Sequence, residues 1–390
     1  MDGVRIAERM GRIQPFYVMD LLARARELER SGRDLVHMEV GEPDFATPKP
    51  IVRAGQKVLA GGRIRYTPAL GLPELREAIA GHYADRFGVT LEPGRVAVTP
   101  GASGALLLAL GVLVNPGDEV LMADPGYPCN RHFVELLEGR PLSLSVGAET
   151  GYQLTAELVE AAWTPKTRVV LVATPSNPTG TLLRPDQLRA LQRVVGERGG
   201  MLIVDEIYHQ LVFDQPAYTA LSQTSELFVI NSFSKYFCMT GWRLGWLVAP
   251  AEYLDAIDRL AQNIFLAAPT LSQHAALAAF SEETLALTDQ RRQAFRERRD
   301  FLLPALRELG FDLPLTPEGA FYLYAGCKKQ TGDSFAFAQE LLERGGVAVT
   351  PGRDFGNNRP KEHLRFAYTT KIARLEEGVE RIRRFIAAGG

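Results

Sequence analysis

The segment SFSKYFCMTGWRLGW (232–246) places a lysine and an arginine among aromatic and small residues. Lys235 follows an apolar run and stands beside Ser232 and Ser234, and Arg243 lies eight residues farther along. A lysine at the end of a strand is usually solvated, but an arginine offers a bidentate fork that suits a phosphate group. A lysine amine held near a bound phosphate is what an imine with a phosphorylated aldehyde requires. The segment therefore indicates covalent chemistry at Lys235.

Asp205 ends the apolar run MLIVD (201–205), and Tyr208 follows three residues later. An aspartate in this place can simply cap a following helix. An ionised carboxylate in an apolar setting, however, needs a cationic partner. The protonated nitrogen of a pyridine ring is such a partner, and a lysine imine with an acidic partner for the pyridinium is typical of pyridoxal phosphate. From these residues alone, both interpretations stay open.

Three further motifs could either form ordinary structure or bind a ligand. TPGASGALLLAL (99–110) joins a strand to an apolar helix, with Ser103 as a candidate helix N-cap. Backbone N–H groups at such a helix start can also hold phosphate, although the loop lacks the spacing of a P-loop or a dinucleotide fingerprint. SNPTG (176–180) is by default a proline-containing turn. Arg365 is by default a surface charge, although apolar residues flank it.

Short apolar runs predict the strands that position these residues. The runs are RVAVT (95–99), DEVLMAD (118–124), TRVVLVAT (167–174), MLIVDE (201–206), LFVINS (227–232) and RLGWLVA (243–249). Runs of this length fit strands buried on both faces, and the longer helical patterns between them fit crossovers in a mostly parallel sheet. Nearly every run ends in polar or Gly/Pro-rich residues, and ligands bind beyond the carboxyl ends of such strands. The sequence therefore predicts an α/β fold with a site at one sheet edge.

A second, smaller sheet is predicted from the segments 319–326, 346–352 and 363–369. Helical patterns precede it from Pro250 onward and also occur before VGEPDF (40–45), so both termini are expected to contribute to a smaller domain. The expected division is an N-terminal arm with part of the small domain (1–48), a large cofactor-binding domain (49–285) and a small C-terminal domain (286–390).

Composition excludes several classes of protein. The 390 residues suffice for two domains. Forty-four basic and 46 acidic residues give a net charge of −2. This charge provides no general electrostatic attraction for nucleic acid or an anionic membrane surface, so a small-molecule partner is expected. Three separated cysteines and a charged N-terminus predict a soluble, cytoplasmic protein. The longest apolar run (105–114) is about half a membrane span, and the six histidines show no metal-ligand spacing.

Taken together, these residues resemble the class I and II family of pyridoxal phosphate-dependent aminotransferases, of fold type I and like aspartate aminotransferase. The resemblance covers essentially the whole chain and includes VGEPDF, YTPALGLPELREAIA (66–80), TPGASGA, DPGYP, TPSNPTG, DEIY, SFSKYFCMTGWRLGW and HLRFAY. It implies a large domain with a mostly parallel sheet flanked by helices, a smaller α/β domain built from both termini, and a homodimer.

The resemblance also implies a role for each candidate residue. Pyridoxal 5'-phosphate would be covalently bound to Lys235, whose amine then moves a proton from the substrate Cα, while Asp205 would keep the pyridine nitrogen protonated. At the cofactor ring, Tyr127 would stack on the face, and Tyr208 and Asn177 would bind the phenolic oxygen. The phosphate would be bound by Ala102, Ser103, Ser232, Arg243, and Tyr66 of the neighbouring subunit. The substrate carboxylate would be bound by Arg365, with Asn177 and the backbone of Gly41. No metal is implied.

The phosphate loop departs from one pattern within the family. Some bacterial aspartate aminotransferases of this group carry a lysine there that contacts a distal carboxylate, whereas the loop around Ser103 has none. Phe16 and Tyr17 lie where relatives line the side-chain pocket. The resemblance therefore favours a neutral, aromatic or broad range of L-amino acid donors, with a 2-oxo acid such as 2-oxoglutarate or pyruvate as acceptor.

Two alternatives fit part of these observations. A carbon–sulfur β-lyase would use the same residues, because its chemistry diverges only after the shared carbanion. A regulator with an aminotransferase-like domain would need a basic helix-turn-helix before VGEPDF, where too few residues are present.

Overall fold

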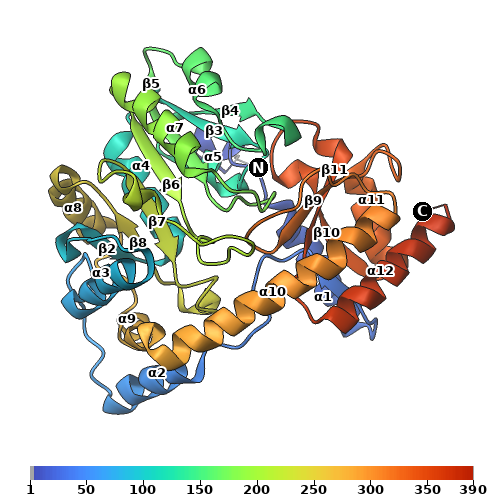
Figure 1. Cartoon of the computed structure of the whole chain (residues 1–390), viewed down its shortest axis with the longest axis horizontal. Helices are drawn as coiled ribbons and strands as arrows, with labels where there is room; N and C mark the ends of the chain where they lie inside the picture. The colour runs from blue at the N-terminus through green and yellow to red at the C-terminus, as the bar shows by residue number, and fades with distance from the viewer. Residues whose placement is uncertain (1–3, 390) are drawn as a thin grey trace.

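The computed structural model, which describes residues 4–389, contains two β-sheets surrounded by helices (Figure 1). The larger sheet has seven strands in the order β2-β8-β7-β6-β5-β3-β4, and the smaller sheet has four in the order β1-β10-β11-β9. The mixed α/β fold that the alternating apolar runs and helical patterns predict is confirmed.

The larger sheet is parallel over most of its width. Its strands are β2 (Val96–Thr99), β3 (Glu119–Asp124), β4 (Arg140–Ser145), β5 (Thr167–Ala173), β6 (Met201–Asp205), β7 (Phe228–Ser232) and β8 (Gly245–Val248). Only β8 pairs antiparallel, with β2 on one side and β7 on the other. The apolar runs predict all of these strands except β4. That strand lies at the sheet edge, where residues of RPLSLS are partly or fully exposed, so it has no continuous apolar run.

Helices surround the larger sheet. They are α2 (Lys49–Gly61), α3 (Pro73–Phe87), α4 (Gly101–Leu113), α5 (Pro128–Leu136), α6 (Ala156–Ala162), α7 (Pro185–Glu197), α8 (Leu254–Ile264) and α9 (Thr270–Ala276). Two of them, α2 and α9, pack mainly on each other and on neighbouring helices rather than directly on the strands. The most apolar is α4, which packs on β7 and β8 and buries Leu106, Leu108 and Leu110. Its N-terminus is therefore fixed at the carboxyl end of β7, near Lys235.

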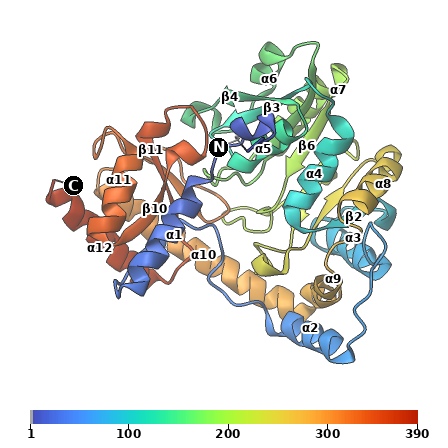
Figure 2. The ribbon, with the colours of Figure 1, turned by 180° about the vertical axis from the view of Figure 1, so that it is seen from behind.

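The smaller sheet combines both ends of the chain. Its strands are β1 (Val36–Met38), β9 (Tyr322–Gly326), β10 (Val347–Pro351) and β11 (His363–Ala367), with helices α1 (Tyr17–Arg30), α11 (Ser334–Glu340) and α12 (Ile372–Ala387) beside it. Strand β1 pairs in parallel with β10, and Val36 lies opposite Val347. Both views show α1 beside the C-terminal elements (Figures 1 and 2). The division of the chain at residues 48 and 285 stays a prediction.

A single long helix connects the two sheets. Helix α10 (Glu282–Glu308) has 27 residues, which corresponds to about 40 Å. Figures 1 and 2 show it running from the region of α2 and α9 to the smaller sheet. Arg298 near its middle donates two hydrogen bonds to Asp44, at 2.7 and 3.0 Å. The loop that contains Asp44 and Gly41 is thereby held between the sheets.

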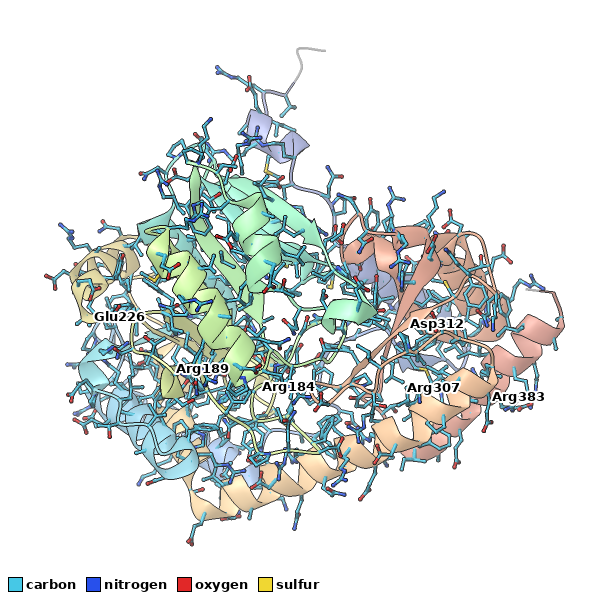
Figure 3. The ribbon with its side chains drawn as sticks, turned by 45° about the horizontal axis from the view of Figure 1, so that its top comes forward. Arg184, Arg189, Glu226, Arg307, Asp312 and Arg383 are labelled. Atoms are coloured by element: carbon cyan, nitrogen blue, oxygen red, sulfur yellow. The ribbon has the colours of Figure 1, made fainter. Side chains whose placement is uncertain are left out.

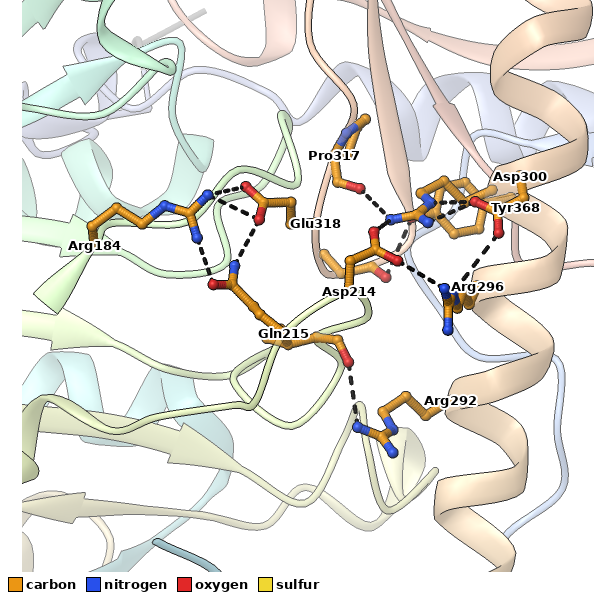
Figure 4. Close-up of polar contacts among 12 residues, drawn as sticks. Arg184, Asp214, Gln215, Arg292, Arg296, Asp300, Pro317, Glu318 and Tyr368 are labelled. Carbon is orange, nitrogen blue, oxygen red and sulfur yellow. Dashed lines mark hydrogen bonds and ion pairs between the residues drawn. The ribbon is translucent and has the colours of Figure 1, made fainter.

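A polar network ties the loop after β6 to the segment that leads into β9 (Figure 4). Arg184 and Gln215 both bind the carboxylate of Glu318, each at 2.7 Å. Asp214 binds Arg299 of α10 at 2.6 Å. These contacts fix strand β9 against the carboxyl ends of β5 and β6, where the candidate residues lie.

Charges of both signs are spread over the surface. Figure 3 labels Arg189, Glu226 and Arg383, all of which are exposed. Within residues 4–389, no helix is both long enough and apolar enough to cross a membrane.

Candidate active site

One cavity of about 290 Å³ lies beyond the carboxyl ends of β5, β6 and β7 and against the smaller sheet. The predicted site residues that line it are Gly41, Ala102, Ser103, Tyr127, Asn177, Asp205, Tyr208, Ser232, Lys235, Arg243 and Arg365. They come from separate strands and loops of both sheets. This convergence is what the polar endings of the apolar runs predict for an α/β sheet.

Lys235 lies in the turn after β7, with its amine inside the cavity. Its Nζ donates a 2.6 Å hydrogen bond to the carbonyl oxygen of Gly41. Burial of the amine, which disfavours its charged form, lowers the pKa of Lys235 to about 8. A lysine with this pKa holds a much larger neutral fraction near pH 7.5 than a free lysine does, and the neutral amine is the nucleophile.

Asp205 is the last residue of β6 and is 6% exposed. Its Oδ1 accepts a 3.0 Å hydrogen bond from the backbone N–H of Ile207 in a turn, so it does not cap a helix. Burial raises the pKa of Asp205 to about 6, although the Ile207 N–H and the charge of Lys235 both oppose that rise. A buried carboxylate with so little compensation is suited to a cationic ligand group.

The first turn of α4 faces Arg243 and Ser232. The helix begins at Gly101, so Ser103 is its third residue and not its N-cap. A Cβ on Gly101, whose φ is +70°, would lie 2.8 Å from a guanidinium nitrogen of Arg243. The arginine itself has a φ of +51° and precedes β8. Backbone N–H groups of an open helix start, a serine hydroxyl and a guanidinium together make an anion site.

Arg365 on β11 is 3% exposed and faces the cavity from the smaller sheet. It donates to Oδ1 of Asn177 at 2.9 Å, to Oγ1 of Thr350 at 3.2 Å and to the carbonyl of Glu39. Its Nε has no hydrogen-bond partner among residues 4–389. A buried guanidinium with a free donor is suited to a carboxylate ligand.

The N-terminal segment forms an apolar wall of the same cavity. Phe16, Val18 and Met19 line it, and the ring of Phe16 meets that of Tyr127 edge-on at 6.3 Å. The buried carboxylate of Asp354 accepts hydrogen bonds from the first N–H groups of α1, at Tyr17 (2.9 Å) and Val18 (2.8 Å). This cap fixes the direction in which the N-terminal segment crosses the cavity.

Among residues 4–389, two of the residues expected at the site do not line the cavity. Tyr17, expected beside Phe16 in the side-chain pocket, instead packs against Phe335 and Arg353. The other is Tyr66. Its side chain is 82% exposed between α2 and α3. The single chain therefore does not bring Tyr66 to the other residues, and its role in a neighbouring subunit stays a prediction.

Sequence reasoning missed Tyr322, which lines the cavity from β9 and is 1% exposed. The alternation in FYLYAG indicates that Tyr322 and Tyr324 share one face of a strand, but not which face meets the cavity. Val18, Met19 and Leu106 were also missed, because apolar residues on helices read as ordinary core.

The residues present fit a phosphorylated pyridine aldehyde. Lys235 offers an amine of lowered pKa, Asp205 a buried carboxylate, and the start of α4 with Arg243 an anion site in which a Cβ on Gly101 would crowd the guanidinium. Within residues 4–389, no group of three or more histidine, cysteine, aspartate or glutamate side chains is arranged to hold a metal ion.

Comparisons with known proteins agree over the full length. The sequence pattern of the family "Aminotransferase class I and II" matches residues 33–382. A valine–pyruvate aminotransferase of Mycobacterium tuberculosis is 41% identical, over 97% of each chain. A (5-formylfuran-3-yl)methyl phosphate transaminase of Methanocaldococcus jannaschii is 36% identical, over 98% of this chain and 99% of that protein. The crystal structure of an aminotransferase from Mycobacterium tuberculosis superposes with a TM-score of 0.96, at 40% identity, and covers 99% of this chain and 100% of that one.

Proposed function

This chain belongs to the class I and II aminotransferase family, and we propose that it transfers the amino group of a neutral L-amino acid to a small 2-oxo acid. The chain is an aminotransferase, and members of the family depend on pyridoxal phosphate, which they bind through a lysine. The proposal concerns the substrates and the residues that act on them.

Each cavity residue has one task in this proposal. When bound, pyridoxal phosphate supplies a protonated pyridine ring that draws electrons from the substrate α-carbon. Lys235 attaches the cofactor, and its Nζ later accepts the proton from the α-carbon. Asp205 keeps the ring nitrogen protonated. The remaining cofactor contacts come from Tyr127 at the ring face, Tyr208 and Asn177 at the ring oxygen, and Ala102, Ser103, Ser232 and Arg243 at the phosphate.

Arg365 orients the substrate through its carboxylate, with Asn177 and the backbone of Gly41 beside it. The free Nε of Arg365 and its hydrogen bond to Asn177 support this role. A carboxylate held in this way fixes the amino group and the α-hydrogen relative to Lys235, so much of the rate gain would come from orientation.

The residues of the cavity wall are the main support for the proposed substrates. The cationic side chains that line the cavity are Lys235, Arg243 and Arg365, and all three already have a task. The side-chain region is lined by Phe16, Val18 and Met19. A second carboxylate, as in aspartate or 2-oxoglutarate, would lose water here without gaining a cationic partner. Apolar donors such as valine and a small acceptor such as pyruvate avoid this cost.

We expect kcat/KM for valine or leucine with pyruvate to exceed that for aspartate with 2-oxoglutarate by roughly 100-fold. The measurement is a panel of amino donors crossed with both acceptors. Met19→Lys, which adds a cation at the cavity wall, should narrow the ratio, while the matched Met19→Leu should leave it unchanged. Equal efficiency with the dicarboxylic pair in the parent enzyme would refute the assignment.

We further infer that the enzyme works as a homodimer in which Tyr66 completes the phosphate site of the neighbour. Support comes from the exposure of Tyr66 and from the exposed apolar side chains of Leu59 and Ile64 near it. Exposed apolar side chains grouped in this way are typical of an interface between subunits. The expected mass in solution is twice the 43.0 kDa of one chain.

Tyr66→Phe should weaken cofactor binding by about 10-fold, because it removes one hydrogen bond to a charged group. At a cofactor concentration that leaves most Tyr66→Phe sites empty, mixing Tyr66→Phe subunits with inactive Lys235→Ala subunits should restore activity above that of either preparation. Each mixed dimer holds one site with both defects and one site with neither. An active monomer, or no recovery after proven subunit exchange, would show that the site is not shared.

A cytoplasmic location is also proposed. It is supported by the three cysteines, which are all free in the structure. Free thiols persist in a reducing compartment.

A further inference from the structure

Tyr322 lies next to three residues of the candidate site, Tyr208, Arg365 and Gly41. Its hydroxyl lies 2.7 Å from the hydroxyl of Tyr208. Its ring lies under the guanidinium of Arg365, whose Cζ is 4.3 Å from the ring centroid. A Cβ on Gly41 would come within 1.9 Å of the Tyr322 oxygen, and the carbonyl of Gly41 accepts the hydrogen bond from Lys235.

The backbone around Tyr322 is fixed, so these contacts are part of the fold. Gly319 and Ala320, just before β9, donate hydrogen bonds to the carbonyls of Gly180 (3.0 Å) and Leu211 (2.8 Å). Strand β9 pairs with β11, with Leu323 opposite Phe366. Tyr322 is therefore held between the loop after Asn177 and the loop after Asp205. Its position is set from both sheets.

The proton of Tyr208 decides the direction of the hydrogen bond between the two phenols. A phenol has one proton to donate and accepts through its oxygen. Burial raises the pKa of both Tyr208 and Tyr322, so both hydroxyls stay protonated near neutral pH. If Tyr208 donates its hydrogen bond to the phenolic oxygen on the cofactor ring, it has no second proton to donate. Its own oxygen must then accept the hydrogen bond from Tyr322. A donor that itself accepts a hydrogen bond is a stronger donor.

The ring of Tyr322 has a second contact that does not depend on its hydroxyl. The Arg365 guanidinium lies between the rings of Tyr322 and Phe355, at 4.3 and 4.9 Å from their centroids. Flat cations are attracted to aromatic faces, most strongly where water is excluded. The two rings therefore restrict the plane in which Arg365 presents its donors to a carboxylate.

We propose that Tyr322 is a positioning residue with two roles. Its hydroxyl makes Tyr208 a stronger hydrogen-bond donor to the phenolic oxygen on the cofactor ring. Its aromatic ring holds Arg365 in place for the substrate carboxylate. The inference rests on the functions proposed above for Tyr208 and Arg365. The two groups of Tyr322 can be removed separately, because phenylalanine lacks only the hydroxyl and leucine lacks the ring as well.

The test follows the visible absorbance of the lysine-bound cofactor as a function of pH, together with KM and kcat for the amino donor. A hydrogen bond donated to an oxygen stabilises its deprotonated form. Tyr322→Phe should therefore raise the midpoint of the absorbance change by about 0.5 to 1 pH unit and leave KM within about twofold. Tyr322→Leu should raise the midpoint similarly and also raise KM by about 10-fold.

Tyr324→Phe is the matched control. Tyr324 is buried on the same face of β9, but it stacks on His363 and does not line the cavity. Its substitution should change neither the midpoint nor KM. Thermal unfolding of each variant reports whether the fold is kept. If Tyr322→Leu does not fold, Tyr322→Phe decides the role of the hydroxyl, and Phe355→Leu, which removes the other ring beside Arg365, tests the role of the rings through KM.

Tyr208→Phe separates failure of this inference from failure of the proposed function. If Tyr208→Phe raises the midpoint and Tyr322→Phe does not, Tyr322 has no effect on Tyr208 and the inference is wrong, while the function proposed for Tyr208 stands. If neither variant moves the midpoint, the function proposed for Tyr208 fails and the inference fails with it. An equal shift in Tyr324→Phe would show a general packing effect and would also overturn it.

Discussion

Lys235→Ala is expected to lower transaminase turnover by more than about 10⁴-fold, because no other amine among residues 4–389 lines the cavity to attach the cofactor and take the α-proton. The variant should fold and still bind the cofactor without a covalent bond. Borohydride reduction followed by mass measurement should add the cofactor mass to the parent chain and not to the variant.

The exposed Lys166 provides a control for that experiment, since Lys166→Ala removes an amine that does not line the cavity. It should keep both the covalent adduct and normal turnover. A Lys235→Ala protein that keeps both the visible absorbance of the lysine-bound cofactor and normal turnover would show that Lys235 is not the residue that attaches the cofactor.

Asp205→Asn should lower kcat by about 10³-fold, because electrostatic stabilisation of developing charge is commonly the largest contribution to catalysis. The amide keeps the shape of the carboxylate but cannot hold a protonated ring nitrogen as a charged partner. Glu206→Gln is the matched control. Glu206 is the next residue and is fully buried, but it binds Thr219 and the N–H of Ala220 and does not line the cavity. Turnover of Asp205→Asn within about 10-fold of the parent would contradict the proposed role.

Asp205→Asn, which should lower turnover, is not expected to destabilise the cofactor-free protein. Burial raises the pKa of Asp205 from 3.8 to about 6, so between these values the folded protein binds the proton more tightly than the unfolded chain. Stability of the parent must therefore fall as pH rises through this window. Asp205→Asn lacks this loss, and at pH 8 its cofactor-free form should unfold at the same temperature as the parent or higher. A lower unfolding temperature would indicate that Asp205 mainly supports the fold.

The site residues that could be predicted from the sequence alone lie at the ends of apolar runs. Asp205 and Ser232 each end a continuous run of buried residues, and parallel strands deliver their carboxyl ends to one edge. Arg365, from the smaller sheet, could be assigned only through the family resemblance, because a single arginine in an antiparallel strand carries no such signal. Their presence in one cavity is an observation, whereas their chemical roles stay predictions.

What the sequence could not provide depends on pairing between distant segments. Strand β4 has no continuous apolar run because it lies at an edge. Tyr322 reaches the cavity only because β9 pairs with β11 and its preceding segment binds the loops at Gly180 and Leu211. The role proposed for Tyr66 would need a second chain, and no property of its local sequence distinguishes it from an ordinary exposed tyrosine.

The apolar wall made by the N-terminal segment has a consequence for how such enzymes diversify. Phe16, Val18 and Met19 lie more than 180 residues before Asp205 in the chain, and they are held in place by Asp354, which does not line the cavity. If this wall selects the amino donor as proposed, substitutions at these positions would alter which amino acid is accepted while the residues around Lys235 remain unchanged. We therefore expect donor preference and cofactor chemistry to change independently of each other, because they depend on side chains from different parts of the chain.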